Sequence, residues 1–294
     1  MGKPVFIAGA TGTGKSAVAM EVAQKKSGEI VSVDSMQVYQ RMDIGTAKPT
    51  TEQREQVPHH LIDCATISEG FDAARFARAA QRTETNIKQA VFCGGTGLYF
   101  KAWLEGLGEA PAGDPKVRRE LEKTETQELL KEIKKKDPAT FLSIDHHNPR
   151  RIVRAVEVIR ITGKPFSEQK AKWTNRAPTN FFLIERTSED LRGRIETRVE
   201  NMFKRGLVEE TCSLRSELED NPIAQQALGY RQVISHLKGE LGLPETVSLV
   251  KSRTWQFARR QKTWFKKLNQ TTVVQVLESE GPEEIAQQII KLIE

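Results

Sequence analysis

Long hydrophobic runs are absent from this sequence of 294 residues, and no apolar stretch approaches the roughly 20 residues needed to cross a bilayer. The apolar stretch at residues 5–8 is too short for a secretory signal and leads directly into a glycine-rich segment. Position 6 is Phe, which does not fit an N-myristoylation motif. We therefore expect a cytoplasmic protein with no membrane partner.

Cysteine is also scarce. Cys64, Cys93 and Cys212 lie far apart, and no Cys-x-x-Cys pair occurs. This spacing argues against a disulfide framework and against a zinc site, and it fits a reducing compartment. We expect all three cysteines to be buried free thiols.

Positive charge is in moderate excess, with a net charge of +6, and it is unevenly distributed. Residues 113–176 contain 16 Lys and Arg against 10 Asp and Glu, and residues 251–268 contain seven basic residues and no acidic one. Clusters of this kind attract a polyanion, although solvated helix faces have the same composition. Composition alone leaves both interpretations open.

Short apolar stretches alternate with helix-favouring segments along most of the chain. We predict strands at residues 5–8, 30–33, 91–93, 181–184 and 273–277, a helix at 16–26 and a closing helix from Pro282. This alternation predicts an α/β fold: a P-loop NTPase-like parallel sheet with helices on both faces.

The alternation stops between residues 113 and 176, where charged, helix-favouring stretches occur at 117–136 and 149–161. Gly113-Asp114-Pro115 marks the start of this region and the loop at 171–178 its end. We predict a helical insertion at 113–176, with a core formed by residues 1–112 and 177–294.

The glycine-rich segment after the first strand matches the pattern G-x-x-x-x-G-K-[ST]. In such a loop the backbone N–H groups and the start of the following helix bind phosphate, the lysine reaches the distal phosphate, and the hydroxyl of the last residue can bind Mg²⁺. ATP, GTP or another diphosphate could be the ligand. The predicted diphosphate-binding residues are Gly9, Ala10, Thr11, Gly12, Thr13, Gly14, Lys15 and Ser16, with Ser16 as the metal ligand.

A carboxylate is expected beside this loop. Asp34 ends the second predicted strand, and in open α/β sheets the ligand crevice lies beyond the carboxyl ends of the strands. Asp34 could orient Mg²⁺ or act as a general base, or it could cap the next helix. A second tight loop, at residues 94–97, follows the third strand in the same way.

Several further blocks accompany these motifs in a specific order. They are the segments at 34–39, 43–49, 58–63, 94–99, 148–155, 163–167, 228–231 and 260–264. Together with the P-loop, this series resembles bacterial tRNA dimethylallyltransferases, also called tRNA isopentenyltransferases, over nearly the whole chain. Ala10 and the pair Gly12-Thr13 depart from the usual loop of that family, but they leave the phosphate cradle in place.

The resemblance implies transfer of a dimethylallyl group from dimethylallyl diphosphate to N6 of the adenosine 3′ of the anticodon, position 37 of tRNA, with release of pyrophosphate. It implies Mg²⁺ as cofactor, Asp34, Thr96 and Arg118 at the reacting base, and Arg198 on the diphosphate. The tRNA anticodon stem-loop is the implied partner of a protein that we expect to be a monomer. The residues implied to contact it are Asp34, Ser35, Met36, Gln37, Arg150, Arg151, Ile152, Val153, Arg154, Gln226, Ala227, Leu228, Gly229, Tyr230 and Arg231.

Other functions remain compatible with the P-loop. A small-molecule kinase or an adenylate isopentenyltransferase would need neither the basic insertion nor the arginine-rich blocks. A regulatory RNA-binding NTPase would need a γ-phosphate sensor, for which no convincing motif occurs.

Two smaller features are predicted to be structural. We expect the aromatic residues among the arginines at 255–265 to be core, and His59 and His60 to give hydrogen-bonded support.

Overall fold

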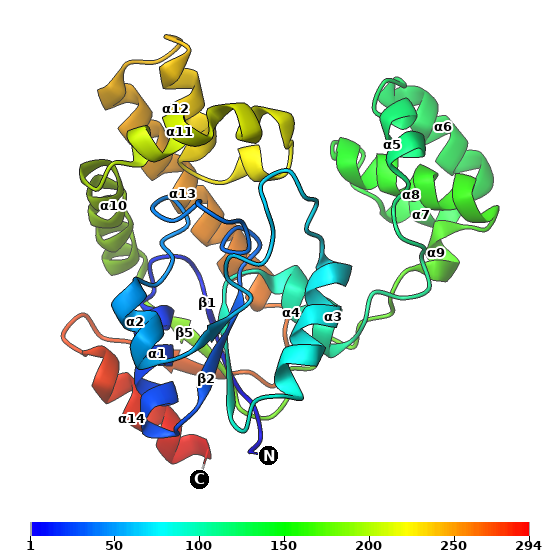
Figure 1. The fold of residues 1–294 in the computed structure, drawn as a ribbon. Helices are drawn as coiled ribbons and strands as arrows, with labels where there is room; N and C mark the ends of the chain where they lie inside the picture. Colours follow the sequence, from blue (N-terminus) through cyan, green and yellow to red (C-terminus); the bar gives the residue numbers. More distant parts are fainter. Residues whose placement is uncertain (1, 294) are drawn as a thin grey trace. The chain divides into compact units, whose positions relative to one another are not determined.

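The computed structural model describes residues 2–293. It divides the chain into two compact units (Figure 1). One contains the residues up to Trp103 together with those from Asn175 onward, and the other contains Leu104–Thr174.

The first unit is built on a six-stranded sheet in the order β3-β2-β4-β1-β5-β6, in which every neighbouring pair is parallel. This confirms the predicted α/β class. The short edge strand β3 was not predicted, because two histidines carry no apolar pattern. The strands are β1 (Val5–Gly9), β2 (Glu29–Val33), β3 (His59–His60), β4 (Ala90–Gly94), β5 (Phe181–Glu185) and β6 (Thr272–Gln275).

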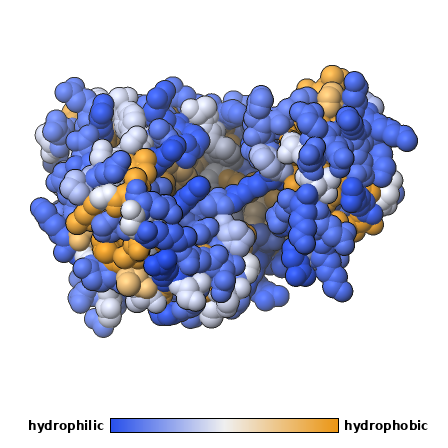
Figure 2. All heavy atoms as spheres, turned by 90° about the horizontal axis from the view of Figure 1, so that it is seen from above, coloured by the Kyte–Doolittle hydropathy of each residue, from blue (hydrophilic) through white to orange (hydrophobic). Residues whose placement is uncertain are grey.

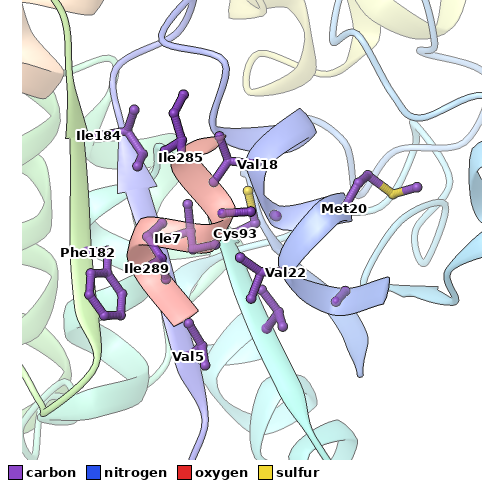
Figure 3. Packing of buried hydrophobic residues seen from close by; sticks show 14 of the residues in the cluster. Val5, Ile7, Val18, Met20, Val22, Cys93, Phe182, Ile184, Ile285 and Ile289 are labelled. Atoms are coloured by element: carbon purple, nitrogen blue, oxygen red, sulfur yellow. The ribbon is translucent and has the colours of Figure 1, made fainter. Parts of the chain in front are cut away.

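Alternate residues of the central strand β1 point to opposite faces of the sheet, and both faces are covered. Val5 and Ile7 belong to a buried cluster that also contains residues of α1 (Lys15–Lys25) and α14 (Pro282–Ile293) (Figure 3). On the other face the Phe6 ring lies 5.5 Å from the rings of Phe92 and Trp103, measured between centroids. Burial on both sides explains why β1 is a continuous apolar run.

Helices connect the strands and cover both faces of the sheet (Figure 1). A long segment between β5 and β6 adds α10, α11, α12 and α13, and part of this group packs on the loop after β1 through a cluster containing Ala10, Leu191 and Ile195. The remaining helices of this unit are α2 (Thr51–Gln56), α3 (Ala73–Glu84), α4 (Gly97–Leu104), α10 (Ser188–Lys204), α11 (Leu207–Asp220), the 3₁₀ turn η1 (Ala224–Gln226), α12 (Tyr230–Leu237) and α13 (Leu243–Phe265).

The second unit is built mainly of helices and has its own core, in which Leu121, Ile133 and Ile152 are fully buried. The predicted helix-favouring stretch at 117–136 is divided in two, because the chain turns between Glu122 and Glu125. Its helices are α5 (Pro115–Leu121), α6 (Thr126–Lys136), α7 (Pro138–Ser143), α8 (Pro149–Thr162) and α9 (Phe166–Gln169).

The boundaries of this helical unit differ from the predicted 113–176. The unit begins at Leu104, where α4 ends, and it ends at Thr174. The two segments of chain at its base pair through an antiparallel bridge between Gly108 and Lys170, so residues before Gly113 already belong to it. A bridge of this kind leaves no turn motif in the sequence.

None of the helices between residues 2 and 293 combines the length and the apolar character that a membrane crossing requires. The space-filling view in Figure 2 shows hydrophilic residues over most of the visible surface, with hydrophobic residues gathered in smaller areas.

Candidate active site

Four neighbouring strands of the sheet, β2, β4, β1 and β5, are each followed by a loop at the carboxyl edge. The loop after β2 contains Asp34, the loop after β4 contains Thr96, and the loop after β5 contains Arg186. The loop after β1 is the segment at residues 9–16. Because these strands are consecutive neighbours in a parallel sheet, the four loops lie side by side at one edge. The sheet therefore brings together a phosphate-type loop, a hydroxyl and a carboxylate.

The loop at 9–16 has the backbone that its glycines allow. Gly12 and Gly14 have φ values of 87° and 88°, in the left-handed region that disfavours side chains. Gly14 is the N-cap residue of α1. Among residues 2–293, the amides of Gly12, Gly14, Lys15 and Ser16 donate no hydrogen bond to a protein acceptor. Amides without a protein acceptor, next to a helix N-terminus, form a cradle for an anion.

Two arginine side chains donate hydrogen bonds to backbone carbonyls of this loop. Arg186 donates from Nε to the carbonyl of Thr13 at 2.9 Å, and Arg194 donates from Nε to the carbonyl of Gly12 at 2.9 Å. The Arg186 guanidinium is itself buried and paired with Asp190 at 2.7 Å. These two hydrogen bonds restrain the peptide planes at Gly12 and Thr13. Neither arginine was predicted from the sequence, since each acts through a carbonyl that no motif marks.

A cavity of about 700 Å³ opens beside the loop. Its lining includes Gly12 and Gly14 together with Arg194, Thr197 and Arg198 of α10. Arg198, which the resemblance places on the diphosphate, therefore lies next to the loop. The cavity is large enough for a small phosphorylated ligand.

Two half-buried cations, Lys15 and Arg198, lie at this loop. Burial lowers the pKa of Lys15, and the nearby guanidinium of Arg198 lowers it further, while the carboxylate of Asp34 opposes this effect. Burial likewise lowers the pKa of Arg198, again opposed by Asp34. Two partly desolvated cations close to one carboxylate form a site in which the binding of an anion relieves their mutual repulsion.

The segment after β2 forms a turn organised by Asp34. Its Oδ1 accepts hydrogen bonds from the backbone amides of Met36 at 2.8 Å and Gln37 at 3.3 Å. No helix follows directly, since α2 begins at Thr51, so the alternative that Asp34 caps the next helix is wrong. The Thr96 hydroxyl accepts from the amide of Ser35 at 3.1 Å and so attaches this turn to the loop after β4. The predicted residues Asp34 and Thr96 therefore lie together.

A second hydrogen-bond network connects this turn to the loop at residues 43–47 and to α11 and α12. Gln37 donates from Nε2 to the carbonyls of Thr46 and Ala47, at 3.2 Å each. The carboxylate of Glu210 accepts from the amide of Ile44 at 2.8 Å and from the hydroxyl of Tyr230 at 2.6 Å. Glu210 thus joins α11, the 43–47 loop and α12. It has no motif of its own and was not predicted.

The segment 226–231 is divided by burial. Ala227 and Tyr230 are buried, whereas Gln226 and Arg231 are exposed. Burial raises the pKa of Tyr230 far above that of a free tyrosine, so its hydroxyl keeps its proton and donates to Glu210. The polar ends of this segment present their side chains to solvent, and Leu228 between them is half-buried.

In the helical unit, Arg118 of α5 and Arg154 of α8 share one acid. Each donates to Oε2 of Glu157 at 2.7 Å, and the Glu157 side chain is fully buried. Burial opposes ionisation of Glu157, but the hydrogen bonds from Arg118 and Arg154 outweigh it and lower its pKa. Arg154 also donates to the carbonyl of Pro111 at 2.5 Å.

The other predicted residues of α8 lie on both sides of the helix. Arg150 and Arg151 are exposed. Ile152 and Val153 are buried in the core of the helical unit, so their side chains are not available to a partner. Helical periodicity within a contiguous motif explains this division.

The remaining sequence expectations have mixed outcomes. Phe265 is buried as predicted, whereas Trp255, Phe257 and Trp264 are half-buried, so the expectation of a core position is met in full by Phe265 alone of these four. The Trp264 ring packs against Gly97, where an added Cβ would lie 2.2 Å from the indole. His59 donates from Nδ1 to the Val57 carbonyl, and His60 donates from Nε2 to the carboxylate of Glu29. Residues 2–293 contain no group of three His, Cys, Asp or Glu that could hold a metal ion.

The expectation that all three cysteines are buried is wrong for two of them. Cys93 is buried, and burial raises the pKa of its thiol to about 11. Cys64 and Cys212 are exposed. Cys93 lies on the central strand β4, where both faces are covered, whereas the other two lie outside the sheet.

Known proteins resemble this chain over most of its length. A family model described as IPP transferase matches residues 37–268. The chain is 40% identical over 275 residues to tRNA dimethylallyltransferase 1 of Citrifermentans bemidjiense, an alignment that covers 91% of this chain and 90% of that protein.

Two solved structures are similar as well. The full-length tRNA isopentenylpyrophosphate transferase of Bacillus halodurans superposes with a TM-score of 0.68 at 34% identity, and the match covers 99% of this chain and 96% of that one. A eukaryotic dimethylallyltransferase, described in crystallographic snapshots of the enzyme acting on tRNA, gives a TM-score of 0.78 at 26% identity, covering 98% of this chain and 77% of that one.

Proposed function

Because the chain belongs to the IPP transferase family, we propose that it is a tRNA dimethylallyltransferase. The proposed reaction transfers the dimethylallyl group of dimethylallyl diphosphate to N6 of adenosine 37 in tRNA and releases pyrophosphate. The observation that carries the proposal is the pairing, at one sheet edge, of an anion cradle at residues 9–16 with the carboxylate of Asp34.

The cradle at residues 9–16 is suited to stabilise the negative charge of a leaving diphosphate. As the bond between the allylic carbon and oxygen breaks, negative charge develops on the departing pyrophosphate. The amides of Gly12 and Gly14 and the cations of Lys15 and Arg198 are positioned to stabilise that charge. Because the cradle is preorganised by Arg186 and Arg194, it needs no rearrangement as the charge develops.

The carboxylate of Asp34 is suited to accept a proton from the amine of the acceptor adenosine. The exocyclic amine of adenosine is a weak nucleophile, because its lone pair is delocalised into the ring. We assign Asp34 as the general base: as the bond from N6 to carbon forms, the N6 proton passes to Oδ2 of Asp34, which accepts no hydrogen bond from residues 2–293. The other oxygen, Oδ1, is already committed to the amides of Met36 and Gln37, which fixes the orientation of the carboxylate. The Thr96 hydroxyl is assigned a contact near the same base.

Magnesium fits the residues present. Mg²⁺ usually keeps several waters and takes few protein ligands beside substrate phosphates, so a cluster of carboxylates is not required. Ser16, exposed in the first turn of α1, offers a hydroxyl beside the cradle. When bound, Mg²⁺ would neutralise charge on the leaving pyrophosphate.

The tRNA contacts are assigned to exposed polar residues. Arg150 and Arg151 of the helical unit, Gln226 of η1 and Arg231 of α12 present side chains to solvent. An anticodon-loop adenosine must leave its stack to reach the crevice, and single-stranded loops are recognised by phosphate contacts combined with stacking. We assign Arg118 to the substrate tRNA and the helical unit to tRNA binding, by a monomeric protein.

The test is a transfer assay with radiolabelled dimethylallyl diphosphate and Mg²⁺, offered unmodified tRNA, AMP or water as acceptor. The proposal predicts label in tRNA only, lost when adenosine 37 is replaced by guanosine. Label in AMP would indicate an adenylate isopentenyltransferase instead. Turnover of ATP without label transfer would indicate a kinase or a regulatory NTPase.

A further inference from the structure

One side chain joins the loop at 9–16 to the loop at 94–97. Gln261, on α13, accepts a hydrogen bond at Oε1 from the amide of Thr11, at 2.8 Å. Its Nε2 donates to the carbonyl of Gly95, at 2.9 Å. These partners lie 250 and 166 residues away in sequence, and each belongs to a loop that leaves one of two neighbouring strands, β1 and β4.

The carboxamide of Gln261 satisfies both partners at once. Both partners are backbone groups, one a donor and one an acceptor, so the side chain must supply an acceptor on one side and a donor on the other. The Gln261 side chain is buried, so a lost hydrogen bond would leave a buried backbone group without a partner. The contact is also tight on the other side: a Cβ on Gly95 would lie 2.3 Å from Nε2 of Gln261.

The two joined loops serve different halves of the proposed reaction. The first holds the diphosphate. The second carries Thr96, whose hydroxyl accepts from the amide of Ser35 and whose own amide donates to the carbonyl of Val33, the residue before Asp34. A displacement between these loops would change the distance between the allylic carbon and the acceptor amine, and displacements of about 1 Å cost about 100-fold in rate.

We propose that Gln261 is a positioning residue that sets the spacing between the diphosphate cradle and the Asp34–Thr96 side of the site. This inference rests on the proposed transfer reaction. It predicts that changes at Gln261 lower kcat while leaving the affinity for pyrophosphate and the KM for dimethylallyl diphosphate nearly unchanged.

Gln261→Glu is the informative variant, because it keeps the shape and the acceptor for Thr11. Its second carboxyl oxygen would face the Gly95 carbonyl, so the ionised carboxylate repels the loop, whereas the protonated carboxyl donates to it as the glutamine amide does. Burial beside a carbonyl raises the pKa of such a carboxyl above its ordinary value of about 4.3. The measured quantity is the kcat of the variant divided by the kcat of the unchanged protein at the same pH. This ratio should be about 0.01 at pH 8.5 and should rise as the pH falls towards about 6.

Gly95→Ala provides an independent approach, since its methyl group would displace the Gln261 amide without altering it. We expect a similar loss of kcat, and a double variant no slower than the slower single one. Gln287→Glu, on the exposed face of α14, is the matched control and should keep the original kcat at every pH.

Binding of inorganic pyrophosphate with Mg²⁺, measured by calorimetry, distinguishes positioning from damage to the cradle. The inference expects affinities within about threefold of the unchanged protein for both variants. A Gln261→Glu variant with an unaltered kcat, or with a ratio independent of pH, would overturn the inference. Failure of the unchanged protein to label tRNA would instead overturn the proposed function.

Discussion

The hydroxyl of Thr96 accepts a hydrogen bond from the amide of Ser35 at 3.1 Å, and so joins the segments that follow the neighbouring strands β4 and β2. The same threonine donates its amide to the carbonyl of Val33 at 3.2 Å. Thr96 therefore holds the backbone on both sides of Asp34. A residue singled out for a substrate contact also has a structural task in orienting the proposed base.

This pairing predicts different effects for two small substitutions. Thr96→Ser keeps the hydroxyl and should retain kcat within about threefold, whereas Thr96→Val leaves the Ser35 amide without an acceptor and should lower kcat about 10-fold to 100-fold. Steady-state transfer of label to tRNA measures both. Equal rates for the two variants would show that the hydroxyl does not act on this turn.

Asp34→Asn is expected to separate chemistry from structure. Asparagine keeps the Oδ1 that accepts from Met36 and Gln37, so the turn should persist, but its amide cannot take the N6 proton. We expect kcat to fall about 10²-fold to 10⁴-fold, with pyrophosphate affinity nearly unchanged. Single-turnover assays and calorimetry on the same preparation test this. A kcat close to that of the unchanged protein would remove Asp34 from the mechanism.

The lowered pKa of Lys15 predicts a pH dependence of diphosphate binding. Since burial and Arg198 depress this pKa below the ordinary 10.5, Lys15 loses its proton at a lower pH than a free lysine does. Affinity for pyrophosphate should therefore be full at neutral pH and should weaken as the pH rises through the lowered pKa. Lys15→Met should bind about 10-fold to 100-fold more weakly at pH 7, with the deficit shrinking as the pH rises.

Comparing the two proteins at each pH removes the titration of pyrophosphate itself, which is common to both. A deficit of constant size from pH 7 to 10 would contradict the assigned role of Lys15. Lys25, exposed in the last turn of α1 and paired with Glu283, provides a control as Lys25→Met. That variant should bind pyrophosphate with unchanged affinity.

Glu157→Gln is expected to loosen the helical unit. The buried carboxylate accepts from both Arg118 and Arg154, and its replacement by an amide should lower the free energy of unfolding of this unit by about 2 kcal/mol. Hydrogen exchange of peptides from α5 and α8, in the full chain, measures the change. Glu168→Gln, at an exposed position of α9, should leave exchange unaltered.

The effect should depend on pH with a defined sign. The pKa of Glu157 is lower in the folded state than its ordinary value, so its stabilisation is present above about pH 4.3 and is lost as the pH falls through the folded pKa. The difference in exchange between Glu157→Gln and the unchanged protein should therefore shrink below about pH 4. A difference that grows on acidification would contradict this account.

The sequence by itself determined the local features of this protein. The loop at 9–16 is recognisable because its glycines, Lys15 and Ser16 are contiguous, and the backbone conformation they adopt depends on few other residues. The buried strands are recognisable for a similar reason, since burial on both faces requires continuous apolar runs. Asp34 could be predicted because it follows such a run directly.

Only the tertiary structure decided which distant residues complete the site. Arg186, Arg194 and Gln261 bond to the loop from 173, 182 and 250 residues away, and they bind its backbone carbonyls or an amide. Backbone groups are the same at every residue, so no side-chain pattern in the loop identifies its partners. Strand order and the packing of α10 and α13 bring these partners to the loop, and both depend on the burial of apolar faces over the whole unit rather than on any short motif.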